Sequence, residues 1–182
     1  MDYKHKLIKN IVRYIMNRNQ RSPHFESVLR SMPKAWAGLK GSSLYPNLSG
    51  TVRFYEQPYG ILVLTEVQGL PDTQNTCASP IFGLHILEGE SCTGNAEDPF
   101  ADARIHYNPR RCPHPYHAGD LPPIMSANGY ALSAFLTDRF NIDEIIGKTV
   151  ILHSMPDDLT TQPSGNSGSK IACGEILGRR RR

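Results

Sequence analysis

From residue 34 onward, apolar and polar residues alternate in short runs, the pattern of β-strands with one buried face. The runs are rich in β-branched or aromatic residues and end at Gly, Pro, Asn or Asp; they cover residues 34–41, 50–57, 60–70, 81–89, 129–140, 148–154 and 170–177. Helical patterns of comparable length are absent from this part of the sequence. The pattern predicts an all-β sandwich or barrel.

Two long connections separate these runs, at about residues 89–128 and 154–169. Loops of that length are uncommon in a compact domain unless they carry function or are held by a specific constraint. We therefore expect the chemistry of this protein to lie in the two loops.

The N-terminal segment has a different pattern. Ile8, Ile11, Val12 and Ile15 recur at the spacing of one helical face, and lysines and arginines surround them. This predicts a basic amphipathic helix within an extension of residues 1–30, which can pack on its own domain, dock on a partner or lie on an anionic membrane surface. The chain then divides into this extension, a domain over 31–178 and an arginine tail at 179–182.

Composition narrows the class of protein. Hydrophobic residues make up 39% and charged residues 20% of the 182 residues, as in soluble globular domains. The longest apolar run, 59–67, is far shorter than the roughly 20 residues that span a bilayer. A net charge of +3 gives no reason to expect nucleic acid as a partner. The N-terminal segment lacks the uninterrupted apolar stretch of a secretory signal, so we expect the cytoplasm.

The first long loop contains candidate metal ligands, "HYNP" followed by "CPHPYHAGD". His106, His114, His117 and Asp120 form a set of three imidazoles and one carboxylate, ligand types that suit tetrahedral zinc. The prolines beside His114 favour turns that bring closely spaced ligands together. The alternative from the residues alone is a group of surface histidines in a proline-rich loop.

The second long loop runs from His153 past two acidic residues and a Gly-Ser stretch to Lys170. Its composition is typical of a mobile loop that forms one side of a site and carries a charged residue at its edge. A histidine at the end of a strand is also a common hydrogen-bonded structural residue, so this loop by itself indicates little.

Seven motifs taken together resemble those of copper-zinc superoxide dismutases, in the same order: "GLHILEG", "CTGN", "HYNP", "HAGDLPPI", "ANGYA", "IIGKTVILHSMPDDL" and "GNSGSKIACG". The likeness is to the bacterial branch, with a shortened zinc loop, and covers about residues 34–177. It implies an eight-stranded Greek-key β-barrel, a sandwich architecture with two long functional loops.

The resemblance also implies a role for each matching residue. His106 would bridge copper and zinc, and His114, His117 and Asp120 would complete the zinc site. His85 and His153 would join His106 around copper.

Three further assignments rest on the same resemblance. Asp157 would connect His85 to His114 through hydrogen bonds, and such partners of metal ligands fix ring orientation. Lys170 takes the place of an arginine at the mouth of the copper channel, where a positive charge steers superoxide. Lys170 and the bridging His106 would be the two residues that take part directly in catalysis.

The cysteines agree in part with this family. Cys92 and Cys173 match its intrasubunit disulfide, although a cytoplasmic location leaves their oxidation open. Cys77 and Cys112 have no counterpart: both can be free thiols, and Cys112 is close enough in sequence to His114 to compete for metal.

The sequence departs from the family at a copper ligand. Where the family has G-x-H-x-H, this chain has Gly83-Leu84-His85-Ile86-Leu87, so Leu87 occupies a ligand position. Residues two apart on a strand share a face, and leucine offers no lone pair. Arg104 and Ile105 also replace the small residues that relatives have before the bridging histidine.

Two hypotheses follow. In the first, the protein dismutates superoxide to dioxygen and hydrogen peroxide with an intact zinc site and a copper site weakened by Leu87, so that activity is low. In the second, it is a redox-silent zinc-binding scaffold or interaction module. The sequence leaves copper binding and homodimer formation open.

Overall fold

The computed structural model describes residues 25–71 and 80–179 of the chain. It divides into a unit that ends at Met32 and a unit that starts at Pro33. In the first, helix α2 (Phe25–Arg30) ends where the Ser31 amide and hydroxyl both donate to the carbonyl of Val28. The predicted basic helix around Ile8 to Ile15, Cys77 and the last three arginines lie outside the described residues.

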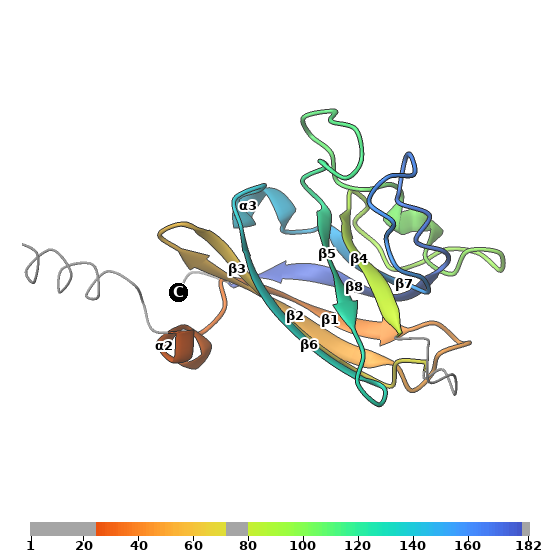
Figure 1. Ribbon diagram of the computed structural model, residues 1–182, viewed down its shortest axis with the longest axis horizontal. Helices are drawn as coiled ribbons and strands as arrows, with labels where there is room; N and C mark the ends of the chain where they lie inside the picture. Colours follow the sequence, from red (N-terminus) through yellow and green to blue (C-terminus); the bar gives the residue numbers. More distant parts are fainter. Residues whose placement is uncertain (1–24, 72–79, 180–182) are drawn as a thin grey trace, which may run out of the picture. The chain divides into compact units, whose positions relative to one another are not determined.

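The second unit is built on eight strands (Figure 1): β1 (Ala35–Gly41), β2 (Ser49–Gln57), β3 (Gly60–Gln68), β4 (Ile81–Leu87), β5 (Asp120–Met125), β6 (Tyr130–Thr137), β7 (Thr149–His153) and β8 (Lys170–Gly178). They form one antiparallel sheet in the order β5-β4-β7-β8-β1-β2-β3-β6. The strands at the two ends of this order, β5 and β6, follow each other in the chain, and the sheet curls into a nearly closed barrel. The eight-stranded, all-β prediction is confirmed.

One strand has no counterpart among the runs read from the sequence. β5 has the sequence DLPPIM and lies inside the connection that we expected to be a loop. Its two prolines cannot donate to a ladder, which removes the usual strand signature. β5 pairs only with β4 in the sheet order, and prolines are tolerated on such edge strands.

Two short helices interrupt the connections. η1 (Ala101–Ala103) lies in the first long loop, and α3 (Ile142–Ile145) lies between β6 and β7. α3 begins after Asn141, whose amide donates to the carboxylate of Glu144 at 2.8 Å, and it buries Ile142 and Ile145 in the core. No helix among the residues the structure describes is long and apolar enough to cross a membrane.

The core determines where a functional site can form. Alternate residues of β4 and β7 point into the barrel: Leu84 and Ile86 from β4, Val150 and Leu152 from β7. The intervening residues, including His85, Leu87 and His153, must therefore face outward. Figure 1 shows both long loops, in green and dark blue, on this side of the sheet, so these outward residues are buried beneath loops.

A second, smaller apolar cluster lies on this outer face. Leu87, Phe100, Ala103, Ile151 and Cys173 pack together, with Cys92 beside them. Phe100 and Ala103 come from the first loop, so the cluster attaches that loop to the barrel wall.

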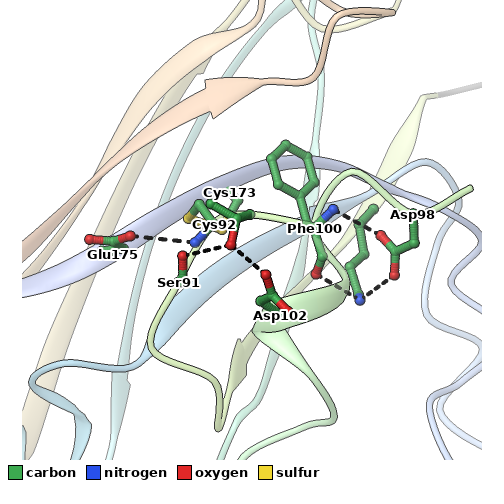
Figure 2. The surroundings of a disulfide bond; sticks show 9 residues. Ser91, Cys92, Asp98, Phe100, Asp102, Cys173 and Glu175 are labelled. Carbon is green, nitrogen blue, oxygen red and sulfur yellow. Dashed lines mark hydrogen bonds and ion pairs between the residues drawn. A yellow bond between two sulfur atoms is a disulfide. The ribbon is translucent and has the colours of Figure 1, made fainter. Parts of the chain in front are cut away.

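The disulfide predicted by resemblance is present. Cys92 and Cys173 are bonded, with their Cα atoms 5.6 Å apart and a sequence separation of 81. Figure 2 shows the bond joining the first loop to β8, where the Cys92 amide also donates to the Glu175 carboxylate at 3.4 Å. The loop is therefore fixed to the barrel covalently as well as by packing.

Candidate metal centre

The structure brings the four residues of the first loop together. His106, His114, His117 and Asp120 each present one ligand atom, and these atoms lie within 4.8 Å of one another. All four residues are buried. Three imidazoles and a carboxylate at this spacing can hold a tetrahedral zinc ion.

Hydrogen bonds hold the loop in this shape. Asp120 opens β5, and its Oδ2 accepts from the amide of His117 at 2.9 Å. Arg139, which follows β6, donates from Nη1 to the carbonyl oxygens of Pro115 at 2.9 Å, Asp120 at 3.1 Å and His117 at 3.4 Å. One guanidinium therefore connects three points of a loop that has few apolar residues of its own.

A second group adjoins the first. His85 from β4, His153 from the end of β7, and His106 also have ligand atoms within 4.8 Å of one another. The ring centroids of His85 and His106 are 3.9 Å apart, and those of His85 and His153 are 4.9 Å apart. His106 belongs to both groups, so its ring lies between two possible ion positions.

Unpartnered nitrogens mark both positions. Within residues 25–71 and 80–179, five buried imidazole nitrogens have no hydrogen-bond partner: His85 Nδ1, His106 Nε2, His114 Nδ1, His117 Nδ1 and His153 Nε2. Buried polar atoms are nearly always satisfied, because desolvating one without a partner costs a few kcal/mol. Five such atoms facing two common points are the arrangement expected of ligands for ions, and the donor set fits zinc fully and copper in part.

Asp157 connects the two groups. Its Oδ2 accepts from His85 Nε2 at 2.7 Å, and its Oδ1 accepts from His114 Nε2 at 2.9 Å and from the amide of Leu159 at 2.7 Å. Protons at the two Nε2 atoms leave the Nδ1 lone pairs of both rings directed at the ion positions. The carboxylate thereby selects the tautomers that metal ligation requires.

Burial favours the neutral form of three of these imidazoles, those of His85, His117 and His153. Burial lowers the pKa of His153 to about 3 and also lowers the pKa values of His85 and His117. Burial acts in the opposite direction on Asp157, but hydrogen bonds from His85, Leu159 and His114 outweigh it and lower the pKa of the carboxyl. Neutral imidazole is the form that binds metal.

The carboxyl of Asp120 is affected in the same way. Burial raises its pKa, but the hydrogen bond from His106 Nδ1, at 2.7 Å, the amide of His117 and the charge interactions with both histidines together outweigh burial, so the pKa is lowered. The carboxylate is therefore charged at neutral pH and balances the charge of a bound cation.

Leu87 lies on the same outward face as His85, at the wall of the second group. Only 1% of the residue is exposed, and its backbone pairs with that of His106. Its side chain packs into the cluster with Phe100 and Ile151. Leu87 thus contributes apolar packing and no donor atom beside the second group, which consists of three imidazoles.

A pocket of about 530 Å³ leads to this group. Leu87, His106 and His153 line it, and Arg104 and Ile105 lie on its wall. Lys170 lines it as well, with its ammonium 2.6 Å from Asp98 Oδ2 and 3.0 Å from the carbonyl of Phe100. Lys170, for which the resemblance predicts a role at the channel mouth, therefore lines the pocket with its ammonium bonded to a carboxylate.

Some of these contacts have no sequence signal. Asp98, Arg139 and Gln162 stand in no recognisable motif, yet the Gln162 side chain holds the backbone of His114 through bonds of 3.0 Å and 2.7 Å. Cys112, considered as a competing ligand, is absent from both groups of candidate ligands within the described part of the chain. Its backbone is instead bonded to the side chain of Asn108.

Known proteins share this architecture. A solved copper/zinc superoxide dismutase from Brucella abortus superposes with a TM-score of 0.65 at 23% identity, covering 78% of this chain and 98% of that one. This likeness shows the fold.

Sequence comparison shows the family. The superoxide dismutase [Cu-Zn] of Deinococcus radiodurans is 32% identical over 145 residues, 70% of this chain and 76% of the relative. The superoxide dismutase-like protein YojM of Bacillus subtilis is 35% identical over 114 residues, 53% of this chain and 56% of that protein. The family model for copper/zinc superoxide dismutase matches residues 48–176. The chain therefore belongs to the copper/zinc superoxide dismutase family.

Proposed function

We propose that this protein is a superoxide dismutase-like metalloprotein with a complete zinc site and a copper site that lacks one imidazole, so that its dismutation of superoxide is slow. The observation that carries the proposal is the distribution of unpartnered imidazole nitrogens. His114, His117 and His106 serve the first group with Asp120, whereas the second group has three imidazoles and Leu87.

Each residue contributes a defined step. Copper, when bound, supplies the one-electron chemistry, and imidazole suits it as a ligand. Asp157 keeps protons on His85 Nε2 and His114 Nε2, which orients both rings. His106 lines the pocket and its buried Nε2 has no hydrogen-bond partner, so this atom would carry the proton that is donated to the reduced substrate. The pocket brings superoxide, the substrate of the family, to that atom.

A redox-silent zinc protein is the second candidate. The packing of Leu87 against Phe100 and Ile151 favours it, because that apolar contact is incompatible with a fourth ligand at this position. Under this alternative the zinc site would stabilise the first loop and the second group would serve no reaction.

Metal loading separates the two candidates. The parent protein and a Leu87→His variant are loaded with zinc and copper, their metal content is measured, copper affinity is determined by competition with a chelator, and superoxide dismutation is assayed. A Leu87→Phe variant is the matched control, because it introduces a ring without a donor nitrogen.

We expect one zinc per chain in all three proteins. Leu87→His should raise copper affinity at least about tenfold, the scale on which even a hydrogen-bond partner of a ligand affects metal binding, and should raise activity with it. Leu87→Phe should raise neither. A parent protein that holds one copper per chain and turns over as fast as Leu87→His would contradict the proposal of an impaired site. A parent that binds no copper would support the redox-silent alternative.

A further inference from the structure

The pocket wall carries an ion pair that the family resemblance does not predict. Asp98 Oδ2 lies 2.6 Å from the Lys170 ammonium, and the same ammonium donates to the Phe100 carbonyl at 3.0 Å. The other oxygen of Asp98 accepts from the amide of Phe100 at 3.0 Å. Figure 2 shows the bond between the Asp98 carboxylate and the Phe100 amide.

This arrangement is more restrained than an ordinary surface pair. The Lys170 side chain is only 15% exposed, and that of Asp98 is 39% exposed. Three bonds close a ring between residues 98–100 of the first loop and the first residue of β8. Both side chains are therefore held in one geometry by contacts besides the ion pair. The ion pair itself then costs less side-chain entropy than an exposed pair, in which that cost offsets most of the attraction.

The pair removes the electrostatic advantage of the pocket. Glu97, Asp98, Arg104 and Lys170 line it, so two acidic residues cancel two basic ones in formal charge. A small anion approaching Lys170 must compete with a carboxylate already bonded to the ammonium. Steering of anions requires a local excess of positive charge, and here that excess is absent from the described pocket lining.

We infer that Asp98 is a positioning residue that holds the Lys170 ammonium against the pocket wall and thereby sets the affinity of the pocket for small anions. For superoxide the consequence rests on the function proposed above: arrival at the metal centre is slow and nearly independent of salt. The anion affinity itself depends only on the pocket.

The test uses the zinc-loaded protein without copper and sulfate as the probe. Sulfate is titrated at pH 7.5 while the backbone amide NMR signals of the pocket residues are followed, first at low ionic strength and then with added sodium chloride. The variants are Asp98→Asn, which keeps the acceptor for the Phe100 amide, and the double variant Asp98→Asn with Lys170→Met. Glu97→Gln is the matched control, because it removes the same charge from the same wall without freeing Lys170.

Asp98→Asn should bind sulfate about fivefold more tightly than the parent, at the upper end of what a partly exposed ion pair contributes. Added salt should weaken that binding, because the freed ammonium is then screened. The double variant should lose this increase in sulfate affinity, and Glu97→Gln should show a smaller increase than Asp98→Asn.

Equal sulfate affinity in Asp98→Asn and the parent would overturn the inference. Equal increases in sulfate affinity in Asp98→Asn and Glu97→Gln would also overturn it, because they would show that removing any one negative charge from the pocket wall has the same effect. Because the measurement needs no copper and no turnover, it can succeed even where the proposed dismutase activity fails. A thermal unfolding midpoint of Asp98→Asn close to that of the parent would show that the gain does not come from loosening the loop.

Discussion

Asp157 is the side chain whose removal should affect both metal positions at once. Its carboxylate accepts from His85 Nε2 at 2.7 Å and from His114 Nε2 at 2.9 Å, and both rings use Nδ1 toward the ion. In an Asp157→Asn variant the amide NH₂ replaces one acceptor oxygen. One imidazole then faces a donor and either loses its bond or moves its proton to Nδ1, where a proton prevents ligation.

The size of the effect follows from this geometry. Loss of a hydrogen-bond partner of a metal ligand typically lowers affinity about 10- to 100-fold, or about 1.4 to 2.7 kcal/mol. Asn has one acceptor oxygen, so one ring can retain its bond while the other cannot. We expect the ion whose ligand loses its partner to show most of this loss and the other ion to show a smaller one.

Chelator competition measures both affinities. Zinc and copper dissociation constants are determined for the parent, for Asp157→Asn and for Asp158→Asn. The latter is the matched control: Asp158 lies one residue away in the same loop, and its carboxylate accepts only from Thr160 and Thr161 among the described residues. Zinc and copper affinities of Asp157→Asn that both equal those of Asp158→Asn would refute the reasoning that the carboxylate orients the rings.

The disulfide and the buried histidines give two further predictions. Replacing Cys92 and Cys173 with serine should lower the free energy of unfolding by about 4.5 kcal/mol in the chain-entropy model, for a separation of 81 residues. Urea unfolding measures this change, and a reducing agent should then lower the stability of the parent but not of the variant. In the metal-free protein, the free energy of unfolding should fall as the pH drops from about 6.5 toward about 3, because burial lowers the pKa of His153 and the unfolded chain binds a proton that the folded chain does not. Burial of His85 and His117 acts in the same direction, and a urea midpoint that stays constant across this range would show that these rings are protonated in the folded state.

The strand pattern was predictable because it is local. Alternation of apolar and polar residues places His85 and Leu87 on one face of β4 before any tertiary contact is considered, and the structure has both on that face. The same pattern did not predict β5, because its two prolines interrupt the alternation of apolar and polar residues. Its pairing with β4, with Asp120 opposite His85, depends on the first loop folding back over the sheet.

The candidate zinc ligands were predictable because all four lie within fifteen residues of the first loop, at a spacing that turns can bring together. The further ligand assignments came from resemblance to a family whose motifs recur in order. Neither source identifies Arg139, because an arginine after a strand has no distinctive pattern. Its role appears only when the loop lies against it and offers three carbonyl oxygens to one guanidinium.

The sequence by itself determined which residue types are available: five histidines and two carboxylates at the matched positions, and a leucine where a sixth imidazole would stand. Only the tertiary structure decided which of these groups, and of the other charged side chains, become partners. His85 and Asp157 are 72 residues apart, as are Asp98 and Lys170, and each pair meets only because the two long loops close over the same face of β4 and β7. Local periodicity determines which face of a strand a side chain takes, whereas loop closure determines its partner on that face. At the pocket wall, loop closure places Asp98 against the ammonium of Lys170.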